Sequence, residues 1–183
     1  MKRILFSFAV LMISLPCIAQ YKIDTPKCTI KWGDVKINDG GKIGVIFDYN
    51  NTLFNGLSYE DYCLMDADFA QDKTDAEKRF TIEFNSALHN RSAVKNRGIG
   101  FKPRAEEADY LIVVTPFEID DHGNFQGKVV LINKEGQNLV TFDKIRCIGG
   151  RIGSFVNLMG DGYERLSKFI GTELSKRIAQ KKL

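Results

Sequence analysis

Histidine and cysteine are scarce in this sequence. The 183 residues include two histidines, His89 and His122, and four cysteines, none of them in a Cys-x-x-Cys pair. Two histidines so far apart provide neither a histidine-based zinc site nor a Ser-His-Asp arrangement. We therefore expect no metal site and no cofactor.

An excess of either charge is also missing. Lysine and arginine total 26, aspartate and glutamate total 23, and two of the basic residues, Lys2 and Arg3, fall in the N-terminal leader described next. The aromatic residues are not interleaved with basic ones, as surfaces that stack on bases require. A nearly neutral chain of this kind does not point to nucleic acid as a partner.

Long hydrophobic runs are absent beyond the first nineteen residues, so no transmembrane segment is expected. That opening stretch, MKRILFSFAVLMISLPCIA, has a charged start, an apolar run at 4–15 and the small residue Ala19. It predicts a secretory signal peptide, because the apolar run is too short for a membrane anchor. Cleavage after Ala19 leaves one domain, 20–183, in the periplasm or outside the cell. Pro16 precedes Cys17 where a lipobox has a small residue, so the protein is not expected to be a lipoprotein.

The first half of the mature chain predicts two strands and then two helices. Alternating apolar residues indicate strands at 28–37 and 42–49. Ser58, with an acidic residue three places on, predicts the cap of a first helix. Thr74 opens a capping-box pattern that predicts the start of a second helix, running to about residue 90. The apolar side of this helix is formed by Phe80, Phe84, Ala87 and Leu88.

The second half predicts a loop at 91–103 with a short strand inside it, then three strands and a helix. The strands, at 108–119, 125–133 and 138–148, are separated by tight turns that leave no room for crossover helices, which predicts an antiparallel meander. A glycine-rich loop, 149–162, then leads to a helix at 163–181. The apolar stripe of this helix consists of Leu166, Phe169, Ile170, Leu174 and Ile178. The predicted fold class is α+β, with a mostly antiparallel sheet (the meander at about 108–148 included) and two or three helices packed on one face.

One stretch, VIFDYNNTLFNG at 45–56, resembles the first motif of the haloacid-dehalogenase-like phosphatases, a strand followed by Asp-x-Asp-x-Thr. In that family the first aspartate attacks phosphorus, and a second one acts as acid and base beside Mg²⁺. The resemblance implies a nucleophile at Asp48 and a hydroxyl at Thr52. It further implies roles for Thr115, Lys144 and Asp161 in the later motifs.

Three features count against this phosphohydrolase hypothesis. Asn50 occupies the position of the general acid, and an amide cannot exchange a proton near neutral pH. The family needs parallel strands with helical crossovers, whereas Thr115 is followed by Pro116 and more strand. Asp161 and Glu164 also fit a capping box for the last helix. A metal-dependent phosphohydrolase using Asp48 is therefore kept as the alternative function.

The glycine-rich loop is a second candidate site. Backbone N–H groups there are a possible cradle for an anion, together with Arg151. The loop lacks the Lys-Ser/Thr of a phosphate-binding P-loop, and we favour a plain connection. The residues concerned are Gly149, Gly150, Arg151, Gly153 and Ser154.

Two other groups of residues are ambiguous or structural. Cys28, Cys63 and Cys147 remain after cleavage, and the sequence leaves open whether one disulfide or only free thiols form. Four aspartates between the two central helices do not match the calcium-loop spacing, so we interpret them as solvated carboxylates at a helix junction. They are Asp66, Asp68, Asp72 and Asp75.

A broader resemblance covers nearly all of the mature chain. The runs VIFDYNNTLFNGLSYEDYC, KRFTIEFNSAL, EADYLIVVTPFEI and YERLSKFIGTELSK resemble a group of secreted proteins of gut-type Bacteroidetes that have no assigned activity. The layout is more distantly similar to small envelope domains of the curli-assembly and TolB N-terminal kind, which act by binding partners. This resemblance implies an exported cell-envelope protein with a non-catalytic binding or assembly role and one or more envelope proteins as partners.

We predict that N-terminal sequencing of the exported protein begins at Gln20, because signal peptidase cleaves after a small residue such as Ala19. Replacing Ala19 by arginine should leave the longer precursor in place. A wild-type protein that still begins at Met1 after export would contradict the assignment of the leader.

Overall fold

The fold combines helices with a mostly antiparallel sheet, as the sequence predicted. The computed structural model describes residues 25–183, so the predicted signal peptide and its cleavage site lie outside the described residues. The strands are β1 (Lys27–Trp32), β2 (Lys42–Phe47), β3 (Leu53–Phe54), β4 (Gly100–Phe101), β5 (Tyr110–Ile119), β6 (Phe125–Asn133) and β7 (Asn138–Cys147). The helices are α1 (Tyr59–Met65), α2 (Phe69–Leu88), α3 (Ser92–Asn96), the 3₁₀ turn η1 (Ala105–Glu107) and α4 (Phe155–Ala179).

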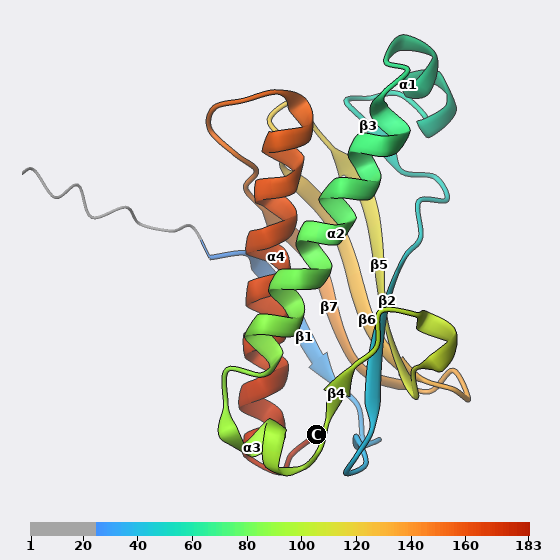
Figure 1. The fold of residues 1–183 in the computed structure, drawn as a ribbon. Coiled ribbons are helices and arrows are strands. Elements are labelled where there is room, and N and C mark those ends of the chain that lie inside the picture. The colour runs from blue at the N-terminus through green and yellow to red at the C-terminus, as the bar shows by residue number, and fades with distance from the viewer. Residues whose placement is uncertain (1–24) are drawn as a thin grey trace, which may run out of the picture.

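The strands form one sheet in the order β1-β7-β6-β5-β2-β4, with the short β3 beside the end of β5 (Figure 1). The pairs β1–β7, β7–β6 and β6–β5 are antiparallel. The neighbours β2–β5, β2–β4 and β3–β5 are parallel. The sheet is therefore mixed, with its antiparallel part made by the longest strands.

The parallel pairing of β2 with β5 corrects one argument made from the sequence. Ile43 lies opposite Tyr110 and Phe47 opposite Val114, and the chain between the two strands contains α1, α2 and α3. A helical connection of this kind is what a parallel pair requires. The prediction that the architecture lacks parallel strands with helical crossovers was therefore wrong for this half of the sheet.

Two long helices, α2 and α4, lie side by side on one face of the sheet (Figure 1). They run parallel to each other, since Phe69 contacts Phe155 near their starts and Phe80 contacts Tyr163 further along. Their closest approach is at Gly171 of α4, where an added Cβ would lie 2.8 Å from the Cβ of Ala87 and 2.9 Å from a backbone oxygen of α2. The two helices can therefore pack this closely only because position 171 has no side chain.

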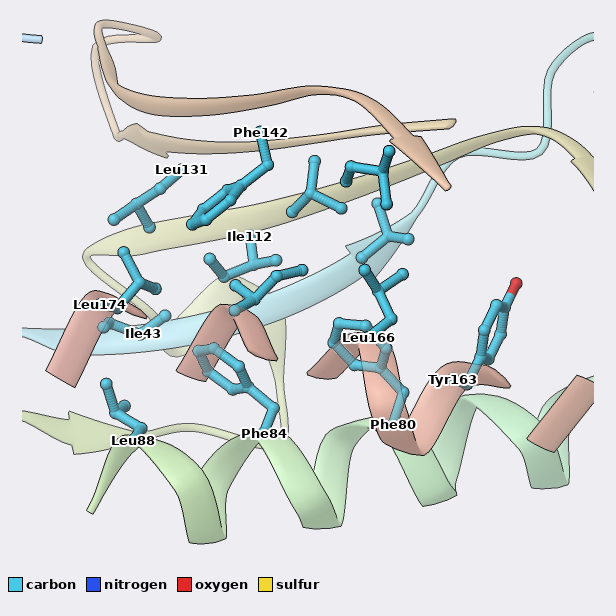
Figure 2. Packing of buried hydrophobic residues seen from close by; sticks show 14 of the residues in the cluster. Ile43, Phe80, Phe84, Leu88, Ile112, Leu131, Phe142, Tyr163, Leu166 and Leu174 are labelled. Atoms are coloured by element: carbon cyan, nitrogen blue, oxygen red, sulfur yellow. The ribbon is translucent and has the colours of Figure 1, made fainter. Parts of the chain in front are cut away.

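The core lies between this helix pair and the sheet (Figure 2). Along β5 every second residue is buried, which is the pattern of a strand with one face against the core. The side chains labelled in Figure 2 come from both layers: Ile43, Ile112, Leu131 and Phe142 from strands, and Phe80, Phe84, Leu88, Tyr163, Leu166 and Leu174 from helices. The buried face predicted for the second helix is confirmed, because Phe80, Phe84, Ala87 and Leu88 are all buried.

Both long helices begin earlier than predicted. Thr74 lies inside α2, where its hydroxyl donates to the carbonyl of Ala70, so it is not a cap. Helix α4 begins at Phe155, which places Asp161 and Glu164 inside the helix and ends the predicted loop at residue 154. The cap predicted at Ser58 is confirmed, since its hydroxyl accepts the N–H of Asp61.

Replacing Gly171 by leucine should destabilise the protein by about 2–3 kcal/mol, because the new side chain would separate the two helices. Lys168→Leu is the matched control on the exposed side of α4, and it should change the free energy of unfolding by less than about 0.5 kcal/mol. Urea unfolding monitored by circular dichroism measures both. Equal stability of the two variants would contradict the proposed helix contact.

Candidate functional site

Asp48 follows the end of β2 and is held in a tight turn. Its backbone N–H donates to the carbonyl of Val114, which continues the ladder to β5, and its carboxylate accepts the N–H of Asn50 at 3.1 Å. Thr52 is buried, and its hydroxyl donates to the carbonyl of Pro116 at 2.8 Å. The Thr52 hydroxyl therefore ties the turn to β5.

Of the residues named in the phosphohydrolase hypothesis, the structure brings Thr52 and Thr115 near Asp48 but not Lys144 or Asp161. Phe47 contacts the rings of Phe80 and Tyr163 in the helix layer, and the Tyr49 hydroxyl is bonded to that of Tyr163. Asp48 between them therefore faces the opposite side of the sheet. Thr115 shares that side, because Val114 and Pro116 on either side of it are buried in the core. Lys144 is exposed on β7, two strands from β5 and so about 10 Å away.

Asp161 belongs to the helix layer, on the other side of the sheet from Asp48. Arg79 extends from α2 to α4, where it donates to Asp161 at 2.6 Å and to Glu164 at 2.7 Å. An added Cβ on Gly160 would lie 2.1 Å from the Arg79 guanidinium, so this glycine leaves the space that the arginine occupies. The acidic pair predicted as a cap instead joins the two long helices.

Backbone N–H groups of the candidate anion loop already make hydrogen bonds within the protein. The N–H of Gly149 donates to the side-chain oxygen of Asn124 at 2.8 Å, and the N–H of Gly150 donates to the carbonyl of Leu158 at 2.9 Å. A Cβ on Gly149 would lie 2.1 Å from the carbonyl oxygen of His122, so the glycine permits close packing on the β5–β6 turn. Two of the N–H groups that an anion would need are therefore already used.

A buried polar pair lies beneath the end of β2. The hydroxyls of Tyr49 and Tyr163 are 3.0 Å apart, and burial raises the pKa of both phenols. Lys73 lies 4.3 Å from the centre of the Tyr49 ring and pairs with Glu77 at 2.6 Å. Both phenols therefore stay protonated at neutral pH.

These elements meet at one end of the molecule, which we call the tip and define as residues 48–68, 117–124 and 148–154. Figure 1 shows α1 and β3 at this end and α3 at the other. Two contacts hold the tip together: β3 pairs with the end of β5, and the ring of Tyr62 on α1 lies 5.3 Å from that of Phe155 at the start of α4.

The tip exposes apolar side chains on several of its segments. Leu64 and Met65 at the end of α1 are 86% and 74% exposed, and Ile152 in the loop is 92% exposed. The others at this end are Leu53, Phe117 and Ile148. Six of the seven exposed large apolar side chains of residues 25–183 therefore belong to the tip.

A recess of about 600 Å³ opens on one side of the tip, between the turn after β2 and the start of α1. Its wall combines two tyrosine rings with amide, hydroxyl and carboxylate groups. The lining residues are Tyr49, Asn50, Asn51, Thr52, Leu53, Ser58, Tyr59 and Glu60.

Metal-ligating side chains and cysteines are the remaining reactive groups of the described residues. Among residues 25–183, one group of three metal-ligating side chains comes within 4.8 Å of one another, namely Asp120, Asp121 and His122 on an exposed turn. The cysteines Cys28, Cys63 and Cys147 are all free. Burial raises the pKa of the Cys147 thiol to about 12, so this cysteine is an unreactive core residue.

Comparison with known proteins assigns the chain to no family. No family model matches the chain. No curated protein sequence matches it either. Among solved structures, it is similar to the PelC dodecamer from Paraburkholderia phytofirmans, with a TM-score of 0.39, 14% identity, and coverage of 82% of this chain and 98% of that chain. A point variant of the same protein gives a TM-score of 0.34 and 13% identity, with the same coverage.

Membrane-spanning helices were searched for in residues 25–183, and none of the helices there is long and apolar enough to cross a bilayer. This agrees with the sequence expectation for the same part of the chain.

The tip was missed by the sequence analysis. Leu64 and Met65 follow Tyr62 and Cys63 directly, so the apolar residues looked like one side of a core helix. A signal was present in the length of α1: a helix of seven residues is too short to bury residues all round its axis. Tyr59, Tyr62 and Cys63 pack against the core, which leaves the next two residues exposed.

We predict that purified protein hydrolyses p-nitrophenyl phosphate in the presence of Mg²⁺ no faster than the Asp48→Asn variant. Asp48 faces away from Asp161, and Asn50 stands where the general acid would be. Turnover that depends on both Mg²⁺ and Asp48 would contradict this prediction and support the phosphohydrolase hypothesis.

Proposed function

We propose that this protein is an exported cell-envelope protein that binds a partner protein through its tip and has a binding or assembly role rather than a catalytic one. The N-terminal leader supports export, and the resemblance to secreted proteins supports the envelope as its location. Within the proposal, the three-stranded meander of β5, β6 and β7 is the rigid part of the scaffold on which the tip is mounted.

The observation that carries the proposal is the exposure of Leu64, Met65 and Ile152. Single exposed apolar residues are common on protein surfaces and need no explanation. Here the three most exposed large apolar side chains of residues 25–183 lie on two segments of one end, α1 and the 148–154 loop. The ring of Tyr62 on α1 contacts that of Phe155, which directly follows the loop, so the two segments are held in place relative to each other.

A binding role also agrees with where the other candidate residues lie. The Thr52 hydroxyl is engaged with β5, and Asp161 is engaged with Arg79. Backbone N–H groups of the glycine-rich loop are engaged with Asn124 and Leu158. Each candidate group already has a structural partner.

Site-specific photo-crosslinking in cells tests the proposal. A benzophenone amino acid in place of Leu64 is expected to capture a specific partner protein, because this side chain points into solvent at the tip. The matched control places the same amino acid at Ile82 of α2, which is 70% exposed but lies away from the tip. Crosslinks of equal pattern from both positions, or none from Leu64, would count against the proposal.

A further inference from the structure

We infer that the tip binds a partner segment that is both basic and apolar, and that the recess beside Tyr59 takes a lysine or arginine side chain of that segment. The inference rests on the partner-binding role proposed above, and it adds the chemistry of the partner. It depends on three features of the tip: its charge, the wall of its recess and its exposed apolar side chains.

The tip is strongly acidic although the chain as a whole is close to neutral. Residues 48–68 carry five carboxylates and no lysine or arginine, and residues 117–124 carry three more and again no lysine or arginine. The basic residue of the loop is Arg151, and Lys73 at the border is paired with Glu77. A surface of this kind attracts a positively charged partner and repels a negative one.

Helix dipoles explain part of this charge but not all of it. Carboxylates in the first turn of a helix stabilise its positive end, which accounts for Glu60 and Asp61 on α1 and for Asp72 on α2. Glu118 and Asp121 lie on a strand end and a turn, where no helix favours a carboxylate. The Glu118 carboxylate accepts a hydrogen bond from the Gln126 amide and that of Asp121 is bonded to the His122 ring, and no lysine or arginine is paired with either of them among the described residues.

Repulsion among the carboxylates shows that their charges act together. Partial burial, and then the neighbouring carboxylates of Asp66, Asp68 and Asp75, raise the pKa of Asp72. A cation bound nearby would relieve this repulsion, which makes binding of a basic segment more favourable.

The recess wall is suited to a cationic side chain. An ammonium or guanidinium group binds favourably over a tyrosine ring, and the Tyr59 ring already has the Lys73 ammonium 5.6 Å from its centre. Glu60 at the rim supplies a carboxylate, and the amides of Asn50 and Asn51 supply neutral acceptors. The wall carries one carboxylate and no lysine or arginine, and the Lys73 ammonium that lies over the tyrosine rings is paired with Glu77.

The exposed apolar side chains further restrict the kind of partner that fits the tip. Leu64 and Met65 are the last two residues of α1, the helix whose first residues, Tyr59 and Glu60, line the recess, so a segment that places a cation in the recess can lay apolar side chains on them. A hydrophilic polycation would leave these side chains in water. An anionic lipid surface is disfavoured by the carboxylates, and a metal ion would make no use of the apolar residues.

Three synthetic peptides of equal length test the inference by fluorescence anisotropy with the mature protein. The lysine–leucine amphipathic peptide is expected to bind, and its glutamate–leucine counterpart is not. A lysine–serine peptide should bind about tenfold more weakly than the lysine–leucine peptide, because it cannot cover the apolar residues. Raising the salt concentration from about 0.05 M to about 0.5 M should weaken lysine–leucine binding by about tenfold.

Charge reversal at the recess supplies the matched variants. Glu60→Lys with Asp61→Lys should weaken lysine–leucine binding by about tenfold, and Tyr59→Leu by about fivefold. Glu106→Lys with Glu107→Lys reverses an equally exposed pair of carboxylates on η1, away from the tip, and should change binding by less than about twofold. Unchanged melting temperatures show that each variant is folded.

Three outcomes would overturn the inference: the glutamate–leucine peptide binds as well as the lysine–leucine peptide, no peptide binds, or the η1 variant loses as much binding as the recess variant. The crosslinking result separates this failure from failure of the proposed function. If a partner protein crosslinks to position 64 through a neutral or acidic segment, the proposed binding role stands. Only the inferred basic character of the partner is then wrong.

Discussion

The close parallel contact of α2 with α4 is the constraint on which the rest of the fold depends. Gly171 lets the two helix backbones meet, and Gly160 makes room for Arg79, which binds two carboxylates of α4. Because the helices run parallel, both begin at the same end of the sheet. This places α1, the 148–154 loop and the end of β5 beside one another, and the tip exists because of this alignment.

The sequence predicted the parts of the fold that depend on local residue patterns. Alternation located β2, β5, β6 and β7 to within two residues at each end, and helical spacing found the buried faces of both long helices. The starts of α2 and α4 were missed because Thr74 and Asp161 carry capping patterns that the tertiary structure does not use. Gly160 and Gly162 indicated a loop, since glycine costs about 1 kcal/mol inside a helix. Here the space beside them is filled by Arg79 and the β5–β6 turn.

The candidate site was harder to predict because its residues come from distant parts of the chain. The sequence placed Asp48 and Thr115 in the order of the phosphatase motifs but not side by side, because the parallel pairing that brings them together depends on a connection of more than sixty residues. Exposure of Leu64 and Met65 follows from how α1 sits on Phe54 and Phe69, which no local pattern encodes. Spacing alone could not separate a core residue from a binding residue.

The pairing of β1 with β7 has a consequence for the order of folding. Lys31 and Asp143 form an ion pair across 112 positions of sequence, whereas β5, β6 and β7 are joined by short turns. Loop closure over so long a separation is slow compared with hairpin formation. We therefore expect β1 to add to the edge of the sheet late, after β5–β7 have formed. If the chain is exported from its N-terminus, as we propose, β1 is the first strand to emerge and stays unpaired until β7 has followed.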